Sequence, residues 1–122
     1  MALVSLKEML ADARKNHYAI PAFDVSNYEM VRAVIDVCEE ERSPAIFMLL
    51  KADLEGRGQK MIIDMIRSAA ETATVPVCIH LDHATCYEDI VSCIEAGANV
   101  LVAGSAVYKA ADIPAKIKEL RG

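Results

Sequence analysis

Two histidines and one aspartate lie close together at the end of an apolar segment of the sequence. The segment VPVCIHLD contains His80 and ends with Asp82, and His83 follows directly. A neutral imidazole binds divalent metals, and a carboxylate beside it can act as a general base. The pattern permits a metal site in which His83 and His80 are candidate ligands and Asp82 is a general base beside them, but a short HxxH on a strand is a weak metal signature. A structural interpretation stays open, in which the histidines are core or loop residues and Asp82 caps the next helix.

The histidines alone supply too few ligands for a zinc site. Catalytic zinc usually has three protein ligands and one open position. The other histidine of the sequence is His17, which precedes the first apolar segment and is expected at the opposite end of the fold. The sequence therefore indicates an incomplete set of ligands.

A glycine and a serine indicate a second kind of chemistry. Gly104 and Ser105 follow the apolar run NVLVA. A glycine followed by a small hydroxyl residue at a strand end exposes backbone N–H groups that can hold a phosphate. A tight turn between a strand and a helix explains the same pattern equally well.

Strands and helices that alternate along the chain must position these residues. Short apolar runs predict strands, and apolar residues at helical spacing predict helices. The predicted strands are residues 18–25, 44–50, 75–82 and 99–108, and the predicted helices are residues 4–14, 28–42, 60–73, 86–98 and 113–122. Four strand–helix units with short connections favour a parallel sheet with right-handed crossovers.

Polar residues follow each predicted strand. Ligands of parallel α/β sheets bind at the carboxyl ends of the strands, so these residues are expected at one rim. Asp24 and Asn27 are candidate substrate-binding residues there, although Asp24, Ser26 or Asn27 can also cap the following helix. The predicted rim consists of Asp24, Asn27, Lys51, Asp53, His80, Asp82, His83, Gly104 and Ser105.

The architecture that these units favour is half of a (β/α)8 barrel with a leading helix, formed by residues 1–122 as a single domain. A complete barrel takes about 250 residues, and the chain has 122. An isolated half would leave two parallel edges unpaired, so a second copy is expected to close the barrel as a homodimer. The hydrophobic content of 54% fits a surface covered by another subunit. An open four-stranded sheet with helices on both faces is the competing architecture.

Composition excludes several classes of protein. A net charge of −5 argues against nucleic acid as a partner, although it permits a small phosphorylated ligand. The sequence shows no signal peptide and no uncharged apolar stretch of about 18 residues, so a cytoplasmic protein without membrane contact is expected. The four cysteines form no CxxC pair and are predicted to be reduced core residues: Cys38, Cys78, Cys86 and Cys93.

Two segments resemble class II fructose-bisphosphate and tagatose-bisphosphate aldolases. They are YAIPAFDVSNYEMVRAVIDVCEEERSPAI and VPVCIHLDHATCYEDI, and the resemblance covers residues 1–96. It implies that Asp82 is the catalytic acid/base, that His83 is a zinc ligand and that the substrate is a phosphorylated sugar. It also implies that zinc polarises the ketone of dihydroxyacetone phosphate and stabilises the enediolate.

The last segment is similar to a different barrel family. EAGANVLVAGSAVYKAADIPAKIKELRG resembles the C-terminal end of ribulose-phosphate 3-epimerases, and the join falls between residues 92 and 97. In that family the Gly-Ser turn holds the substrate phosphate, which gives this role to Gly104 and Ser105. Residues 97–122 then form an epimerase-like closing unit, and the chain is a recombined or designed fragment, or a natural truncated homologue.

The chain departs from the aldolase pattern at several positions. Asp24 stands where that family usually has asparagine, and LLKAD stands where it often has a serine that meets the substrate. The other two zinc histidines of the family and its phosphate-binding loops belong to a C-terminal half that this sequence does not contain. A two-fold dimer would bring a second set of His80, Asp82 and His83 to the same opening.

Three functions follow from these observations. The first is a zinc-dependent aldolase that cleaves or forms a phosphorylated ketose, fructose or tagatose bisphosphate. The second is a catalytically inactive half-barrel that dimerises into a TIM barrel and binds phosphate or metal. The third is a phosphosugar-binding or isomerase-like module that uses the turn at Gly104 and Ser105.

Overall fold

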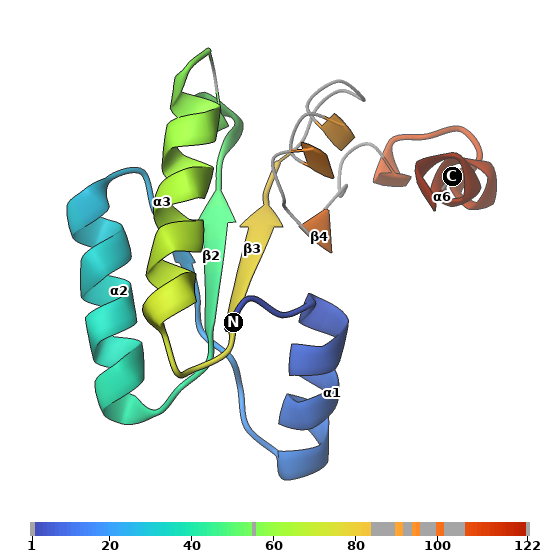
Figure 1. Cartoon of the computed structure of the whole chain (residues 1–122). Helices are drawn as coiled ribbons and strands as arrows, with labels where there is room; N and C mark the ends of the chain where they lie inside the picture. The colour runs from blue at the N-terminus through green and yellow to red at the C-terminus, as the bar shows by residue number, and fades with distance from the viewer. Residues whose placement is uncertain are drawn as a thin grey trace.

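A parallel sheet of four strands carries the fold (Figure 1). The computed structural model describes residues 2–54, 56–83, 90–91, 94–95, 100–101 and 107–121. Within these residues the strands pair in the order β1-β2-β3-β4, and every pair is parallel. The strands are β1 (Ala22–Asp24), β2 (Ala45–Leu49), β3 (Val77–Leu81) and β4 (Val100–Leu101). The predicted α/β class with a parallel sheet is thereby confirmed.

Helices precede and connect the strands, and the local sequence sets where they start. They are α1 (Leu6–Asn16), α2 (Tyr28–Glu41), the 3₁₀ helix η1 (Lys51–Leu54), α3 (Gly58–Thr72) and α6 (Ile113–Arg121). Ser5 and Glu8 form a capping box at the start of α1. Asn27 caps α2, because its Oδ1 accepts a hydrogen bond from the Met30 N–H at 2.9 Å.

The observed boundaries differ from the predicted ones around the first two strands. β1 covers only 3 residues of the predicted strand 18–25, because Pro21 has no N–H to donate to the ladder. The segment after β2, predicted as a polar loop, instead forms η1, and α3 begins at Gly58, before the predicted start at residue 60.

The region after β3 is described only in part. The predicted helix 86–98, with its closing Gly97, lies largely outside the described residues. Within them, β4 covers 2 residues of the predicted strand 99–108. Asp112 opens α6 as predicted, because its Oδ1 accepts a hydrogen bond from the Ala115 N–H at 2.9 Å.

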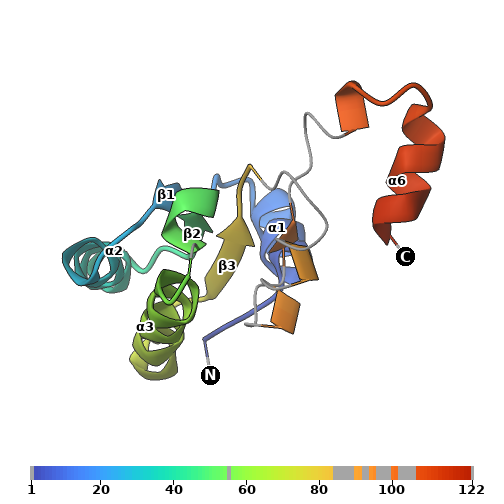
Figure 2. The same ribbon diagram turned by 90° about the horizontal axis from the view of Figure 1, so that it is seen from above.

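Helices lie on both faces of the sheet (Figure 2). Seen from above, α2 and α3 lie on one side of the strands and α1 lies on the other, while α6 stands apart at the far side of the molecule. Figure 1 shows the same separation, with α6 well away from α2. The sheet is therefore covered by different helices on its two faces.

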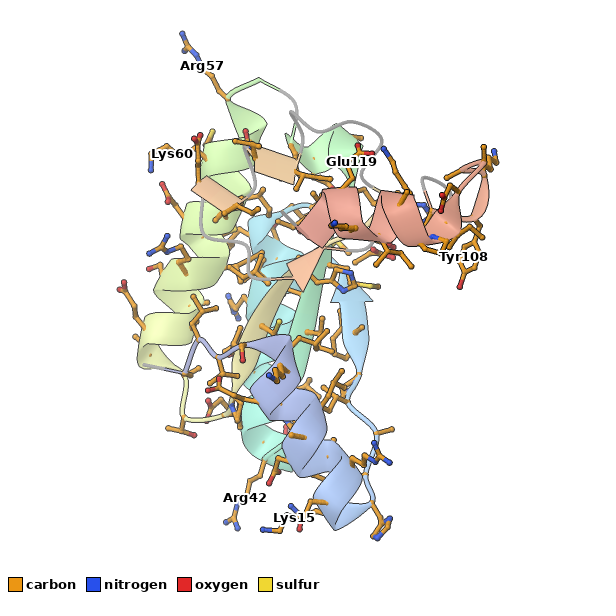
Figure 3. The ribbon with its side chains drawn as sticks, turned by 90° about the vertical axis from the view of Figure 1, so that its right-hand side faces the viewer. Lys15, Arg42, Arg57, Lys60, Tyr108 and Glu119 are labelled. Carbon is orange, nitrogen blue, oxygen red and sulfur yellow. The ribbon has the colours of Figure 1, made fainter. Side chains whose placement is uncertain are left out.

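The two ends of the strands face opposite ends of the molecule (Figure 3). Lys15 and Arg42, near the ends of α1 and α2, lie at the end where the strands start. Arg57 and Lys60, near the start of α3, lie at the end to which the strands point. His17 ends α1 and thus belongs to the strand-start end, as the sequence predicted.

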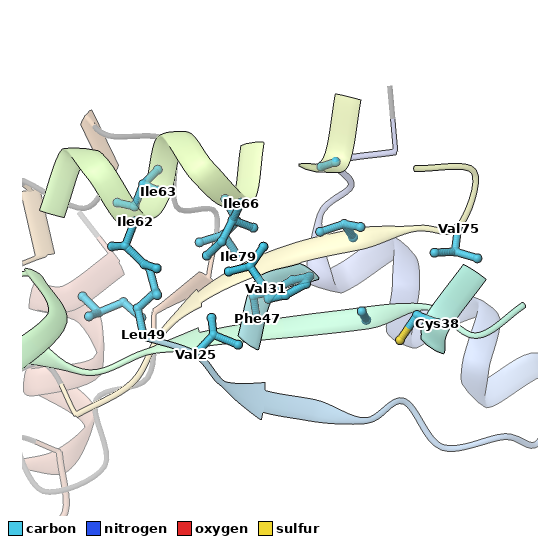
Figure 4. Packing of buried hydrophobic residues seen from close by; sticks show 14 residues of the cluster. Val25, Val31, Cys38, Phe47, Leu49, Ile62, Ile63, Ile66, Val75 and Ile79 are labelled. Carbon is cyan, nitrogen blue, oxygen red and sulfur yellow. The ribbon is translucent and has the colours of Figure 1, made fainter. Parts of the chain in front are cut away.

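One face of the sheet packs against α2 and α3 and holds the main core (Figure 4). Phe47 of β2 and Ile79 of β3 are both 0% exposed on this face. Val31 of α2 and Ile66 of α3 meet them from the helices. Burying one such side chain stabilises the fold by about 1.5–3 kcal/mol, so this layer supplies most of the driving force for folding.

The opposite face is covered along its first half by α1. Met9 of α1 packs with Ile46 and Cys78, which lie near the starts of β2 and β3. Along the second half of this face, Asp24 is exposed and His80 is half-buried. This second half is the part of the sheet closest to the predicted site.

Two expectations from composition can be compared with the structure. Cys38 and Cys78 are buried and form no disulfide, as predicted for core cysteines, whereas Cys86 and Cys93 lie outside the described residues. Burial raises the pKa of the Cys78 thiol to about 11. In the part of the chain that the structure describes, no helix has the length and apolar character needed to cross a membrane.

Candidate active site at the strand ends

The ends of β1, β2 and β3 bring three side chains into one row across the sheet. Asp24 pairs in register with Met48, and Met48 pairs with His80. Paired residues of parallel strands point to the same face, and side chains alternate between faces along each strand. Because Phe47 and Ile79 belong to the core under α2 and α3, the row from Asp24 to His80 lies on the opposite, less covered face.

His80 is half-buried, and its Nε2 atom is shielded from water. Within the described structure this nitrogen has no hydrogen-bond partner. Burial lowers the pKa of His80, while the negative charges of Asp82 and Asp24 act to raise it. The imidazole is therefore neutral at pH 7. Because buried polar atoms are nearly always hydrogen-bonded, the lone Nε2 marks a position where a ligand or partner group fits.

Asp82 and His83 contact each other twice at the tip of β3. The His83 N–H donates to Asp82 Oδ1 at 3.0 Å, and His83 Nε2 lies 3.4 Å from Asp82 Oδ2. The Asp82 N–H donates to the Leu49 carbonyl at 2.9 Å, which ties the tip of β3 to β2. The Asp82 side chain is 23% exposed and the His83 side chain is 79% exposed. The carboxylate is thus fixed to the sheet, while the imidazole reaches solvent.

The backbone of His83 lies in the left-handed region, with φ at 56°. A residue other than glycine pays about 1–3 kcal/mol for a sparsely populated conformation of this kind. The strain turns the chain directly after Asp82, at the end of the sheet.

The other predicted rim residues have several different surroundings. Asn27 uses its Oδ1 to cap α2, so the suggestion that Asp24 caps this helix is wrong. Asp53 turns back on the chain, since its Oδ2 accepts the Leu50 N–H at 3.1 Å. Lys51 begins η1. Two predicted phosphate-binding residues lie outside the described residues: Gly104 and Ser105.

Zinc would find only part of its ligand set here. The described residues contain no group of three or more His, Cys, Asp or Glu side chains that could hold one metal ion. The donors that they offer are the exposed imidazole of His83 and the unpartnered Nε2 of His80. Catalytic zinc uses three protein ligands, so the described residues do not form a complete zinc site by themselves.

Sequence reasoning missed one member of the row. Met48 lies between Asp24 and His80 and packs against the small core beneath α1. Alternation within β2 shows which residues share a face, but it does not give the register between strands. The register is what places this methionine beside the two ionisable side chains.

A parallel sheet with ionisable residues gathered at its strand ends defines an α/β protein of the kind that binds ligands at that rim. The sequence pattern of one family, "Fructose-bisphosphate aldolase class-II", matches residues 4–115. The chain therefore belongs to the class II fructose-bisphosphate aldolase family. The match continues beyond residue 96, and the predicted resemblance of the last segment to epimerases stays a prediction.

Curated relatives agree with this assignment. The chain is 35% identical over 113 residues to a fructose-bisphosphate aldolase of Treponema pallidum (strain Nichols), covering 88% of this chain and 34% of the relative. It is 38% identical over 100 residues to a fructose-bisphosphate aldolase of Geobacillus stearothermophilus, covering 80% and 35%. The chain thus spans about a third of the length of these relatives.

Solved structures show the same fold. The YdjI aldolase from Escherichia coli K12 superposes with a TM-score of 0.75 at 36% identity, over 81% of this chain and 39% of that chain. A putative fructose-1,6-bisphosphate aldolase from Coccidioides immitis gives a TM-score of 0.72 at 32% identity, over 79% and 34%. The described sheet and helices are therefore built like one part of a class II aldolase.

Proposed function

We propose that this chain provides the acid/base part of an aldolase site that cleaves or forms the carbon–carbon bond of a phosphorylated ketose. The proposed substrates are fructose bisphosphate and tagatose bisphosphate. The observation that carries the proposal is the pair at the tip of β3, where Asp82 is held beside His83 in a chain of the class II aldolase family.

Aldol cleavage is a proton-transfer reaction around a carbon–carbon bond. A base takes the proton from a substrate hydroxyl, and the adjacent carbon–carbon bond breaks to give an aldehyde. The electron pair of the broken bond stays on the ketone fragment as an enediolate. A proton then returns to that carbon. A carboxylate held in place at the strand tip suits both proton transfers, and Asp82 is the proposed group.

The other candidate site residues have proposed roles that follow from their chemistry. Asp24 and Asn27 can hydrogen-bond substrate hydroxyl groups, with Asn27 using its amide nitrogen because its oxygen caps α2. Gly104 and Ser105 are proposed to hold a substrate phosphate through backbone N–H groups.

Zinc is the proposed cofactor. When bound, zinc polarises the substrate carbonyl and stabilises developing negative charge. His83 is the proposed first ligand, and the unpartnered Nε2 of His80 is a second donor. The remaining ligands must come from beyond the described residues, for example from a second copy of the chain.

Zinc titration together with an aldol cleavage assay tests this function. We expect wild-type protein to bind zinc and to cleave fructose or tagatose bisphosphate. The variant His83→Ala should lose at least about tenfold in zinc affinity. Removing a group that only hydrogen-bonds to a metal ligand typically costs about 10–100-fold, and removing the ligand itself should cost no less. His17→Ala is the matched control, since His17 lies at the other end of the strands. A wild-type protein that neither binds zinc nor cleaves either sugar would refute the proposal.

A second candidate is an inactive half-barrel that closes by dimerisation. It is favoured by the sheet order, in which β1 and β4 are both edges within the described residues. Two copies that pair β1 of one with β4 of the other would remove both edges. Light scattering tests this candidate at about micromolar protein concentration, where a specific dimer is expected to form. A folded monomer at that concentration would contradict the half-barrel dimer.

A further inference from the structure

Helix α2 has an apolar flank on its side away from α3. Met30 is 40% exposed and Val37 is 55% exposed. Val34 lies between them and is half-buried. Residues three and four positions apart share one side of a helix, so these three form a line along α2. We call Met30, Val34 and Val37 the α2 flank.

The α2 flank lies beside the free edge of the sheet. The side of α2 that faces α3 is formed by other residues, including Tyr28 and Ile35, which line a groove of about 430 Å³ with Met65 of α3. β1 is an edge strand in the described sheet, and α2 directly follows it. The flank thus borders the open side of the sheet, where the crossover helix of a further strand–helix unit would lie.

Helix α6 has the complementary property, an apolar side that is exposed. Ile113 and Ile117 are 39% and 42% exposed, and they lie one turn apart on the same side of α6. Tyr108, just before the helix, is 81% exposed. Both views show α6 apart from α2, α3 and the sheet, at the opposite end of the molecule from α2 (Figures 1 and 2).

We propose that α6 of one copy docks on the α2 flank of a second copy, with Ile113 and Ile117 against Val34 and Val37. The inference rests on the half-barrel dimer of the second proposed function and names the surface that holds it. If β4 of one copy pairs with β1 of the other, a right-handed crossover lays α6 over that junction. The helix then lies next to α2 of the other copy, as neighbouring helices do around a (β/α)8 barrel.

Charge favours the same pairing. Between Tyr28 and Glu41, α2 has five acidic residues and one arginine. Between Ile113 and Arg121, α6 has two lysines, one arginine and one glutamate. An acidic helix and a basic helix attract each other and disfavour self-pairing of either one.

A second copy is the proposed occupant because one chain carries both exposed surfaces. They lie at opposite ends of the same molecule, so they cannot satisfy each other within one copy (Figure 2). A two-fold axis satisfies both at once, since each copy gives its α6 and receives the α6 of the other. The contact is therefore made twice in each dimer.

Disulfide trapping tests the geometry directly. The variants Val37→Cys and Ile117→Cys are prepared separately, mixed and oxidised, and we expect a covalent dimer that contains one copy of each. The control is Met61→Cys mixed with Ile117→Cys, because Met61 is 67% exposed but lies on α3. Equal trapping with the control, or a bond formed within one chain in the Val37→Cys/Ile117→Cys double variant, would overturn the inference.

Dimer affinity gives a second readout, measured by sedimentation without zinc or sugar so that it does not depend on aldol activity. Val37→Glu and Ile117→Glu should each weaken the dimer by at least about tenfold, because each buries a charge in an apolar contact. Leu10→Glu is the control, at 48% exposure on α1. A wild-type monomer, or a dimer that both Val37→Glu and Ile117→Glu leave unchanged, would refute the docking. A dimer sensitive to Val37→Glu in a protein without aldol cleavage keeps this inference and removes only the enzymatic proposal.

Discussion

Asp82 and His83 are joined at two points, one through the backbone and one through the ring. The His83 N–H donates to Oδ1 of Asp82 at 3.0 Å, while His83 Nε2 lies 3.4 Å from Oδ2. The backbone hydrogen bond fixes the orientation of the carboxyl group, and the second oxygen remains beside an imidazole that is largely exposed. A proton-transfer group that is positioned before the substrate arrives loses little entropy in the reaction.

Replacement of this carboxylate should affect the reaction more than the fold. Asp82→Asn removes the base but keeps an oxygen that accepts the His83 N–H. We expect aldol cleavage to fall by about 10²–10⁴-fold relative to wild type. The free energy of unfolding, measured by urea titration, should change by less than about 1 kcal/mol, since the hydrogen bond is retained. A variant that keeps the wild-type rate would show that Asp82 is not the acid/base.

Stability should depend on pH through His80. Burial lowers the pKa of this residue in the folded protein below its ordinary value of 6.5. As pH falls through about 6.5, the pKa of an unperturbed histidine, the unfolded chain takes up the proton first. The free energy of unfolding should therefore decrease below that pH, until the folded histidine is also protonated.

The variant His80→Phe tests this dependence, because it keeps a ring of similar shape without the titrating group. Urea titrations between pH 8 and pH 5 should show a weaker decrease than in wild type. Near pH 7 the variant should be about as stable as wild type, since the buried Nε2 has no described protein partner to lose. An unchanged slope in His80→Phe would assign the effect to other groups.

The sequence predicts the order of elements well because each one has a local signal. Ser5 starts α1 with a capping box, and Asn27 caps α2, so both helices begin where side-chain oxygens meet free N–H groups. The continuous apolar runs around Phe47 and Ile79 give buried parallel strands. These features depend on residues a few positions apart, which a single sequence contains.

The arrangement at the site was predicted less well because it depends on contacts between distant residues. The alignment of Asp24, Met48 and His80 follows from the register of three strands, which no local pattern encodes. The lone Nε2 of His80 depends on how deeply that strand is covered. The sequence therefore indicates which residues reach the rim, while only the fold shows which of them are neighbours.

Glu39 should make the fold sensitive to acid. Its carboxylate accepts hydrogen bonds from the Thr74 N–H and hydroxyl, both at 2.5 Å, and from the Val75 N–H at 3.1 Å. These bonds join α2 to the turn before β3. The hydrogen bonds from Thr74 hold the pKa of Glu39 below its usual value of 4.5. The stabilisation from Glu39 is therefore complete above the pKa that Glu39 has in the unfolded chain. It is lost as pH falls through the lower pKa that Glu39 has in the folded protein.

The variant Glu39→Gln separates this contribution from the general effect of acid. It should be less stable than wild type at pH 7, and the difference should shrink as pH falls below about 4.3, the pKa of an unperturbed glutamate. Thermal unfolding followed by circular dichroism measures the stability of both proteins at each pH. The control is Glu40→Gln on the same helix, which removes the same charge. If both variants behave alike, the charge of α2 rather than the link to Thr74 is responsible.

Cys78 should resist alkylation as long as α1 covers the face of the sheet opposite α2 and α3. The residue is 0% exposed, and burial raises the pKa of its thiol to about 11. At pH 8 such a thiol is ionised to about one part in a thousand, whereas an ordinary cysteine with a pKa near 8.5 is about a quarter ionised. Iodoacetamide labelling, followed by peptide mass spectrometry, should be at least about 100-fold slower at Cys78 in native protein than in urea.

Met9 provides the matched test, because this residue of α1 packs directly with Cys78 and is itself 4% exposed. Met9→Ala leaves a cavity over the thiol and should cost about 2–5 kcal/mol of stability, which makes opening of this face more frequent. Labelling of Cys78 should accelerate accordingly. Labelling of Cys38, which belongs to α2 and is buried in the core on the other face of the sheet, should accelerate less if α1 opens locally. Equal acceleration at both cysteines would mean that the two faces of the sheet unfold together rather than independently.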